Sequence, residues 1–86
     1  MNADRRTELR EMLERFVRGE DQSLGFVRQI ELLVSAHFRH AEFFEELSYN
    51  LAMYSPGGGD HLFDEKELVR ELSFLLAGPL ADQPDG

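Results

Sequence analysis

The chain has 86 residues and a formal net charge of -8, and it contains no cysteine. A chain of this length forms one domain with a modest hydrophobic core. The lack of cysteine excludes disulfides, thiolate zinc sites and thiol catalysis. No segment approaches the roughly 18 apolar residues of a membrane span, and the N-terminal residues lack the apolar stretch of a secretory signal. We therefore expect a cytoplasmic protein without a membrane segment.

The negative charge is confined to one half of the sequence. Residues 1–39 hold seven acidic residues and seven arginines, so their charges balance. Residues 40–86 hold ten acidic residues against Lys66 and Arg70, which accounts for the whole net charge. Such a field repels nucleic acid and anionic membranes and favours basic proteins. The sequence therefore predicts a protein partner, with no binding of nucleic acid or membrane.

Apolar residues recur at helical spacing in four segments, which predicts an all-α protein. The first helix is expected at 7–18 and ends at Gly19, and the residues before it are expected to be frayed. Ser23 is a suitable N-cap for a second helix at 23–37. The third and fourth helices are expected at 40–54 and 64–77.

The boundary between the second and third helices is the least certain part of this prediction. No glycine or proline lies between Gly25 and Pro56, and the apolar period continues through the whole interval. One helix of about 30 residues would exceed the usual helix length more than twofold. We therefore predict a break at 37–40. The alternative, one continuous helix, would give an elongated hairpin that dimerises to cover its core.

Turn and capping residues define the last helix. The run from Ser55 to His61 is a glycine-rich loop, and Asp64 with Glu67 forms an acidic variant of the capping box. Gly78 and Pro79 end the helix. Four helices joined by short turns predict a small antiparallel four-helix bundle at 1–78, followed by a disordered tail at 79–86. The residues predicted to be buried are Leu13, Phe16, Ile30, Leu33, Phe44, Leu47, Leu51, Leu72 and Leu75.

The segment 42–54 has two different faces when it is drawn as a helix. One face is apolar and is expected to join the core. Its members are Phe43, Phe44, Leu47, Leu51 and Tyr54. The other face carries Glu42, Glu45, Glu46, Tyr49 and Met53. Three carboxylates beside an aromatic ring and a thioether are suited to attracting and then contacting a cationic partner. The alternative is a solvated face that happens to carry a tyrosine.

Catalytic and metal-binding motifs are weak. His37 and His40 are three residues apart, but no Glu stands three residues before any histidine, as a helical-bundle metal site of the Glu-x-x-His type requires. The glycines at 57–59 are not followed by Lys-Ser or Lys-Thr, so they do not form a P-loop. No serine lies in a Gly-x-Ser-x-Gly elbow. We therefore expect a protein that is not an enzyme and that needs no metal or cofactor.

Three groups of residues together resemble a known family. They are Glu45-Glu46-Leu47, then Tyr54-x-Pro56, then Leu68-x-x-Glu71-Leu72-x-x-Leu75-Leu76. Their spacing and chemistry resemble the colicin D immunity protein family of small bacterial self-protection proteins. The resemblance covers residues 45–76 best. It departs from the family in the loop, where an acidic residue expected after the proline is Gly57.

The resemblance implies an acidic four-helix bundle that binds and blocks a cognate nuclease toxin, in the colicin D case one that cleaves transfer RNA. Together with the charge pattern, it predicts an immunity protein whose partner is a basic nuclease toxin domain. Carboxylates would occupy the groove that holds RNA phosphates. The predicted contact residues are Glu42, Glu45, Glu46, Tyr49, Asp60, Asp64, Glu65 and Glu67. For Asp64 and Glu67, helix capping is the competing explanation.

Two other functions fit the same sequence. One is a homodimeric helical adaptor or structural protein that associates through Leu32, Phe74 or the long-helix alternative. The other is a phage-type polyanion mimic that inhibits a different nucleic-acid enzyme. Between these readings the expected oligomeric state is a monomer or a weak homodimer.

Overall fold

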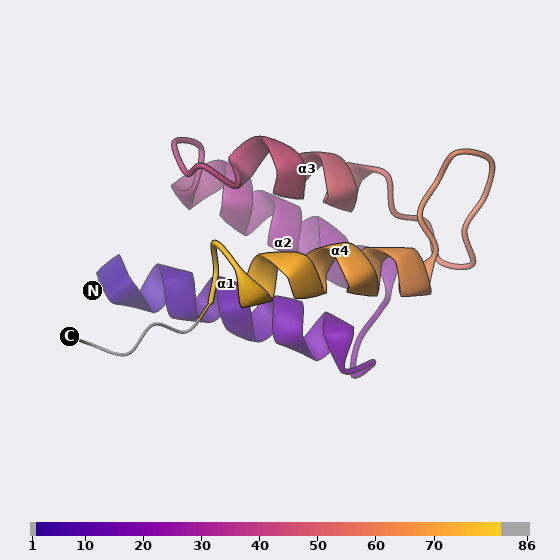
Figure 1. Cartoon of the computed structure of the whole chain (residues 1–86), viewed down its shortest axis with the longest axis horizontal. Helices are drawn as coiled ribbons and strands as arrows, with labels where there is room; N and C mark the ends of the chain where they lie inside the picture. The colour runs from indigo at the N-terminus through magenta and orange to yellow at the C-terminus, as the bar shows by residue number, and fades with distance from the viewer. Residues whose placement is uncertain (1, 82–86) are drawn as a thin grey trace.

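The computed structural model describes residues 2–81, with side chains from Arg5 onward, and contains four helices. They are α1 (Asn2–Val17), α2 (Leu24–His37), α3 (Phe44–Ala52) and α4 (Glu65–Ala77). Each helix runs opposite to the one before it (Figure 1). α1 packs against α2 and α4, and α3 packs against the same two helices, so α1 and α3 lie diagonally across the bundle. The described residues therefore form the predicted all-α antiparallel four-helix bundle.

The hydrophobic core takes one side of every helix. Most of the predicted core residues are buried, namely Leu13, Phe16, Ile30, Leu47, Leu51, Leu72 and Leu75. Leu33 and Phe44 are only partly buried, so the prediction is wrong for these two. Leu33 lies at the edge of the apolar stripe of α2, whose centre is filled by Ile30 and Val34. The neighbouring residue Phe43 occupies the core position instead of Phe44, and its side chain is 6 % exposed.

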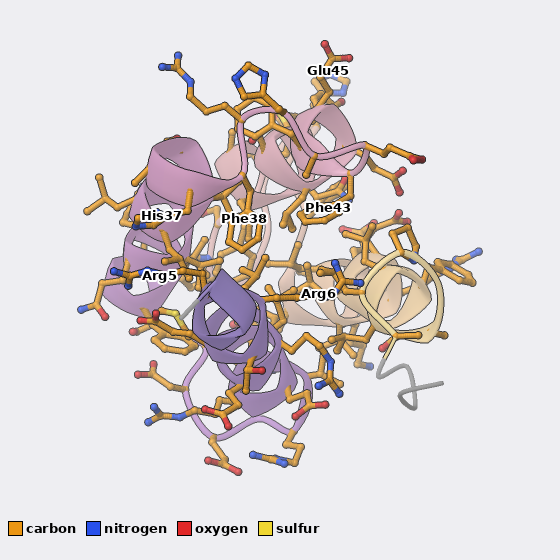
Figure 2. The ribbon with its side chains drawn as sticks, turned by 90° about the vertical axis from the view of Figure 1, so that its left-hand side faces the viewer. Arg5, Arg6, His37, Phe38, Phe43 and Glu45 are labelled. Carbon is orange, nitrogen blue, oxygen red and sulfur yellow. The ribbon has the colours of Figure 1, made fainter. Side chains whose placement is uncertain are left out.

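The chain turns between α2 and α3, as predicted, and this excludes one continuous helix. α2 ends at His37, and two successive turns follow, in which the Ala41 N–H donates to the Phe38 carbonyl and the Phe44 N–H donates to the Ala41 carbonyl, both at 3.0 Å. α3 begins only at Phe44 and ends at Ala52, so the predicted range 40–54 is too long at both ends. The turns rotate Phe43 into the core, where its ring lies 5.7 Å from that of Phe38. Figure 2 shows both rings pointing inward at this end of the bundle.

Both ends of the described chain are more ordered than the sequence predicts. α1 begins at Asn2, although residues before Thr7 were expected to be frayed. The Arg6 guanidinium donates a hydrogen bond to the Pro79 carbonyl, which ties the start of α1 to the end of α4. Leu80 is fully buried and its N–H donates to the Leu75 carbonyl at 2.8 Å. A disordered tail is therefore the wrong description of residues 79–81, because Leu80 closes the end of the core, and 82–86 lie outside the described residues.

The connection from α3 to α4 projects from the opposite end of the bundle (Figure 1). Its two arms are joined at their base, where the Phe63 N–H donates to the Met53 carbonyl at 2.8 Å and the Ser55 N–H donates to the Phe63 carbonyl at 3.0 Å. Gly57 and Gly58 both have φ of 81°, a left-handed conformation that glycine adopts without strain. The loop is thus fixed to the bundle at its base.

Tyr54 joins this loop to the turn between α1 and α2. Its ring is 2 % exposed and packs edge-on against Phe16, with the ring centroids 5.2 Å apart. Its hydroxyl donates to the Gln22 carbonyl at 2.6 Å. Burial raises the pKa of Tyr54 to about 12, and the negative charges of Glu65 and Asp64 add to this effect. Tyr54 therefore stabilises the fold in its neutral form.

Tyr54→Phe is expected to lower the free energy of unfolding by about 1 kcal/mol at neutral pH, because the hydrogen bond to Gln22 is lost. The pKa of Tyr54 is about 12 when folded against 10.0 for a free tyrosine. Its contribution is therefore complete below about pH 10 and is lost as the pH rises through about 12. Urea melts at neutral and alkaline pH should show the difference between wild type and variant shrinking above about pH 10. A constant difference would contradict this account.

Candidate functional site

The two halves of the chain differ in how their charges are used. All the ion pairs between two described side chains join residues within the segment 5–31, which belongs to the half of the chain whose charges balance. Examples are Arg18 with Glu20 at 2.8 Å and Arg10 with Glu14 at 3.3 Å. No carboxylate from residue 40 to residue 81 forms an ion pair with another described residue. The acidic half therefore presents its charge to solvent or to a partner.

The carboxylates of Glu42, Glu45 and Glu46 gather where α3 begins, and we call them the α3 acidic cluster. All three side chains are exposed, and none forms a hydrogen bond or ion pair with another described residue. Figure 2 shows Glu45 pointing away from the bundle. Two like charges about 4 Å apart repel each other by about 1 kcal/mol in water, and by less at larger separations. A cationic partner would relieve this repulsion.

The α3 acidic cluster also has a structural explanation. Phe43 occupies the N-cap position of α3 and provides no side-chain hydrogen bond, while Glu45 and Glu46 lie in the first turn. A carboxylate near the positive end of a helix contributes about 0.3 to 1 kcal/mol. Glu45 and Glu46 therefore partly replace a missing cap. Glu42 precedes the helix.

Tyr49 is the aromatic residue on the outer side of α3. It is 59 % exposed, and its ring meets the edge of the Phe63 ring with the centroids 6.4 Å apart. Phe63 belongs to the loop before α4, so this contact joins the two predicted contact segments. Tyr49 thus presents a fixed apolar surface next to free carboxylates.

The next residue, Asn50, is 4 % exposed, and its side-chain Nδ2 has no hydrogen-bond partner among the described residues.

In the segment 60–67, most of the carboxylates that were predicted to contact a partner accept hydrogen bonds from the protein's own backbone. Asp64 caps α4 by accepting from the Glu67 N–H at 2.8 Å, and Glu67 accepts from the Asp64 N–H at 3.0 Å. The capping box predicted from the sequence is thereby confirmed. Glu65 accepts from the Gly57 N–H at 3.0 Å and so holds the loop against α4. Asp60 is the exception, since it is exposed and has no hydrogen bond or ion pair within residues 5–81.

Asp64→Ala is expected to lower the free energy of unfolding by about 1 kcal/mol, because the first turn of α4 loses its cap. Asp60→Ala is the matched control: it removes a carboxylate of the same loop, and its effect should stay within about 0.5 kcal/mol. Urea melts of both variants measure the two effects. Equal losses would show that the capping box contributes nothing beyond charge.

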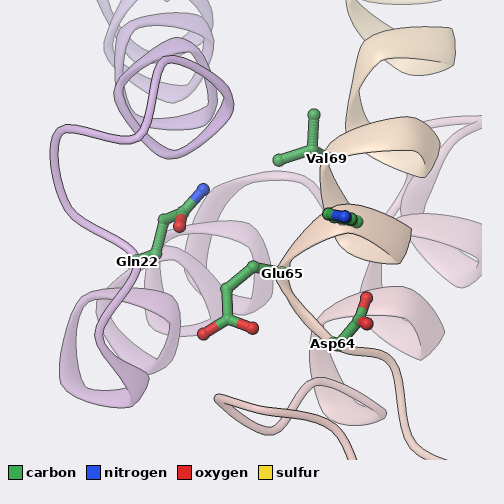
Figure 3. Close-up of a pocket in the computed structure, with 5 residues that line it drawn as sticks. Gln22, Asp64, Glu65 and Val69 are labelled. Atoms are coloured by element: carbon green, nitrogen blue, oxygen red, sulfur yellow. The ribbon is translucent and has the colours of Figure 1, made fainter.

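A hollow of about 640 Å³ lies beside the start of α4, facing the turn between α1 and α2. Figure 3 shows Gln22 across from Glu65 and Val69 in this hollow. Lys66 and Asp64 complete its lining. Because Asp64 and Glu65 already accept backbone hydrogen bonds, their carboxylates have less capacity left for a ligand. We assign no binding role to the hollow.

The predicted contact residues fall into two groups at opposite ends of the bundle. The α3 acidic cluster lies at the end formed by the α2–α3 turn, and residues 60–67 lie at the end formed by the long loop (Figure 1). α3 has nine residues and is about 14 Å long. Tyr49 lies between the two groups and contacts the second through Phe63. The structure connects the two groups along α3 but does not merge them into one patch.

The predicted toxin contacts did not include Phe74 and Glu71 of α4, and Phe74 was named only as a possible homodimer contact. Phe74 is 60 % exposed, although it is a large aromatic residue. Residues 67, 71 and 74 share one side of α4 because they recur at i, i+4 and i+7, and α4 packs against α3. The available signal was that Phe74 lies off the apolar stripe of its helix. An exposed aromatic residue among carboxylates is a typical anchor of a protein interface.

Other kinds of site are not evident within the described part of the chain. No three histidine, aspartate or glutamate side chains there lie close enough together to hold a metal ion. None of the helices between residues 2 and 81 is both long and apolar enough to cross a bilayer. Comparison with protein families, curated proteins and solved structures returns no match for this chain.

Proposed function

We propose that this chain is an acidic immunity protein, which binds a cognate nuclease toxin and blocks its RNA-binding groove. The observation that carries the proposal is the α3 acidic cluster, whose carboxylates are exposed and unpaired on a packed bundle. The surrounding half of the chain holds the whole net charge of -8. The resemblance of residues 45–76 to the colicin D immunity protein family supports the choice of a nuclease as the target.

The mechanism would be mimicry and occlusion. A groove that binds RNA is lined with lysine and arginine, which hold phosphates. Glu42, Glu45 and Glu46 would take the place of those phosphates. The backbone positions of Glu45 and Glu46 are set by the packing of α3, so little ordering free energy is lost when they bind. Tyr49 would supply apolar contact once the charges have aligned the two proteins.

Asp60 is the carboxylate of the second group that is best placed to contribute. It is exposed on the projecting loop, whereas Asp64, Glu65 and Glu67 already accept backbone hydrogen bonds. Phe74 would extend the apolar part of the interface onto α4. The proposed contact surface thus comprises the α3 acidic cluster, Tyr49, Asp60 and Phe74.

The test begins with the neighbouring genes. We expect an adjacent gene that encodes a large secreted protein ending in a basic nuclease domain. That domain, purified and mixed with this protein, should lose its ability to cleave transfer RNA at an equimolar ratio, and the two should co-elute as a complex. Full cleavage at a large excess of this protein would overturn the proposal. A phage operon around the gene would favour an inhibitor of a different nucleic-acid enzyme.

A further inference from the structure

The side of α3 that faces α4 is fixed by two contacts with Phe63, the residue before the N-cap of α4. The rings of Tyr49 and Phe63 have their centroids 6.4 Å apart, and the Phe63 N–H donates to the Met53 carbonyl at 2.8 Å. Glu46 lies three positions before Tyr49, and Asn50 lies three positions before Met53, so both belong to the same side of the helix. This side of α3 therefore carries a carboxylate, an aromatic ring and an amide.

The facing side of α4 carries two carboxylates and another aromatic ring. Val69 lines the hollow beside Gln22, so its side of α4 faces the turn between α1 and α2. Residues 67, 71 and 74 lie on the other side of the helix, where α4 packs against α3. Glu67 and Phe74 are exposed, and Glu71 is partly buried. We call the line along which the two sides meet the α3–α4 seam, and its members are Glu46, Tyr49, Asn50, Glu67, Glu71 and Phe74.

Asn50 is the enclosed polar residue of this seam. It is 4 % exposed, and its Nδ2 is fully buried without a hydrogen-bond partner among the described residues. Its Oδ1 is not bonded there either, but this atom is not enclosed, so the amide reaches the surface through its acceptor. A buried donor without a partner lowers the stability of a fold. The packing of the chain alone therefore gives no reason for an amide at this position, whereas a partner that donates to Oδ1 does.

The charged groups of the seam are acceptors as well. Glu46 and Glu71 form no hydrogen bond or ion pair with another described residue. Glu67 uses only its Oε1, which accepts from the backbone beside it. The rings of Tyr49 and Phe74 are 59 % and 60 % exposed and add aromatic faces, which attract cations. Such a set of acceptors and rings is complementary to a cation that carries several donors.

We propose that the α3–α4 seam binds an arginine side chain of the partner, which rests on the proposed function because that function supplies a basic partner. The guanidinium group is planar, stays charged and presents five N–H donors. In the seam it would donate to Glu71 and to Oδ1 of Asn50 while its plane stacks on the ring of Tyr49. A lysine ammonium is compact and cannot stack in this way. The seam would therefore select arginine over lysine, a choice that net charge alone cannot make.

Asn50→Leu separates this role from a structural one. Leucine has a similar volume and no buried donor, so the urea midpoint of the variant should rise above that of the wild type. Binding of arginine should weaken at the same time, because Oδ1 is lost. A midpoint that falls would mean that the amide serves the fold, and unchanged arginine binding would mean that Asn50 does not contact the cation. Either result overturns the role assigned to Asn50.

The arginine preference is measured with two small probes of equal charge, Nα-acetylarginine amide and Nα-acetyllysine amide. Nuclear magnetic resonance titration of the full chain should show the arginine probe shifting the side-chain amide of Asn50 and the backbone signals of Tyr49 and Glu71. A Kd of about 1 to 10 mM is expected for a ligand of this size. The lysine probe should bind about 5-fold more weakly. Equal binding of the two probes, or shifts that lie outside the seam, would overturn the proposal.

Two variants of equal charge test the place of binding. Glu71→Gln should weaken binding of the arginine probe by about 5- to 10-fold, because a neutral amide replaces the carboxylate of a charge-assisted hydrogen bond. Glu45→Gln is the matched control, since both variants change the net charge from -8 to -7. Glu45 points away from the bundle (Figure 2), so its variant should bind the probe as the wild type does. Equal losses in the two variants would show that only net charge attracts the probe, and would overturn the seam as its site.

Because the probes contain no nuclease, their binding is measured separately from inhibition. A seam without arginine preference is overturned even if the nuclease domain is inhibited at an equimolar ratio. Selective binding of the arginine probe together with full nuclease activity would uphold the seam and assign its arginine to a basic partner of another class.

Discussion

Replacing Leu47, Leu51 or Leu72 with alanine is expected to lower the free energy of unfolding by about 2 to 5 kcal/mol in each case. All three side chains are 0 % exposed and belong to one continuous core. Truncation removes buried methyl groups and leaves a cavity that a close-packed bundle closes only in part. A domain of this size has a total stability of about 5 to 10 kcal/mol. Each substitution would therefore remove a large share of the available stability.

Urea melts provide the measurement, and Leu32→Ala provides the control. The chemistry of the control is the same, but Leu32 is 71 % exposed, so at low protein concentration its effect should stay within about 0.5 kcal/mol. Losses below about 1 kcal/mol for all three core leucines would mean that they do not form the core. Losses of equal size at Leu32 and Leu72 would show that helix propensity, rather than burial, determines the result.

Local signals in the sequence were sufficient for the helices with clear ends. Ser23 was predicted as the N-cap of α2, and its hydroxyl accepts from the Phe26 N–H at 3.2 Å. Asp64 and Glu67 were predicted as a capping box, and both hydrogen bonds are present. Gly19 was predicted to end α1, and its φ of 81° is the left-handed conformation that commonly closes a helix. Each of these interactions spans at most four residues, so the sequence alone contains the information.

The errors arose where distant segments decide the outcome. Phe43 and Phe44 are adjacent and equally apolar, and periodicity places both on the core face. The turns after His37 determine that Phe43 is the one that packs on Phe38. Leu80 follows Gly78-Pro79 in a polar segment, and only the open end of the core between the helices makes it a buried residue. A period of 3.6 residues carries no information about either contact.

In the candidate site, too, the features set by one helix were predicted, and those set by distant segments were not. The exposure of Glu45, Glu46 and Tyr49 was predicted from their phase on one helix, and the structure agrees. The hydrogen bond from Gly57 to Glu65 was not predicted, because it depends on how the loop folds back on α4. The exposure of Phe74 on a helix that packs against α3 likewise needs the tertiary arrangement. Helix phase therefore predicts which side chains reach solvent, but not which of them remain free for a partner.

Reversing the charge of two carboxylates of the α3 acidic cluster, with Glu45→Lys and Glu46→Lys together, is expected to slow association with the nuclease domain by about 10- to 100-fold at low salt. The reversal replaces attraction toward a basic groove with repulsion. Because the carboxylates are exposed, the protein should remain folded, with a loss of about 1 kcal/mol from the first turn of α3. Surface plasmon resonance at two salt concentrations measures the association rate. The effect should shrink as salt screens the charges.

Tyr49→Ala should change the dissociation rate rather than the association rate. The ring is 59 % exposed and is held by its contact with Phe63, so it can dock only after the proteins have met. Its loss should mainly speed dissociation, as is usual for an apolar contact within an interface. This change should depend little on salt. No change in either rate would show that Tyr49 lies outside the interface.

The decisive control for the charge reversal is Glu8→Lys with Glu11→Lys on α1. Both pairs of substitutions raise the net charge from -8 to -4, since each reversal adds two charges. Glu8 and Glu11 are exposed on a helix that does not pack against α3. If the α3 acidic cluster contacts the nuclease, reversal at α1 should leave the association rate nearly unchanged at moderate salt, where charges more than about 10 Å apart are screened. Equal slowing by both pairs would instead mean that only the net charge matters, and that the α3 acidic cluster is not the recognition surface.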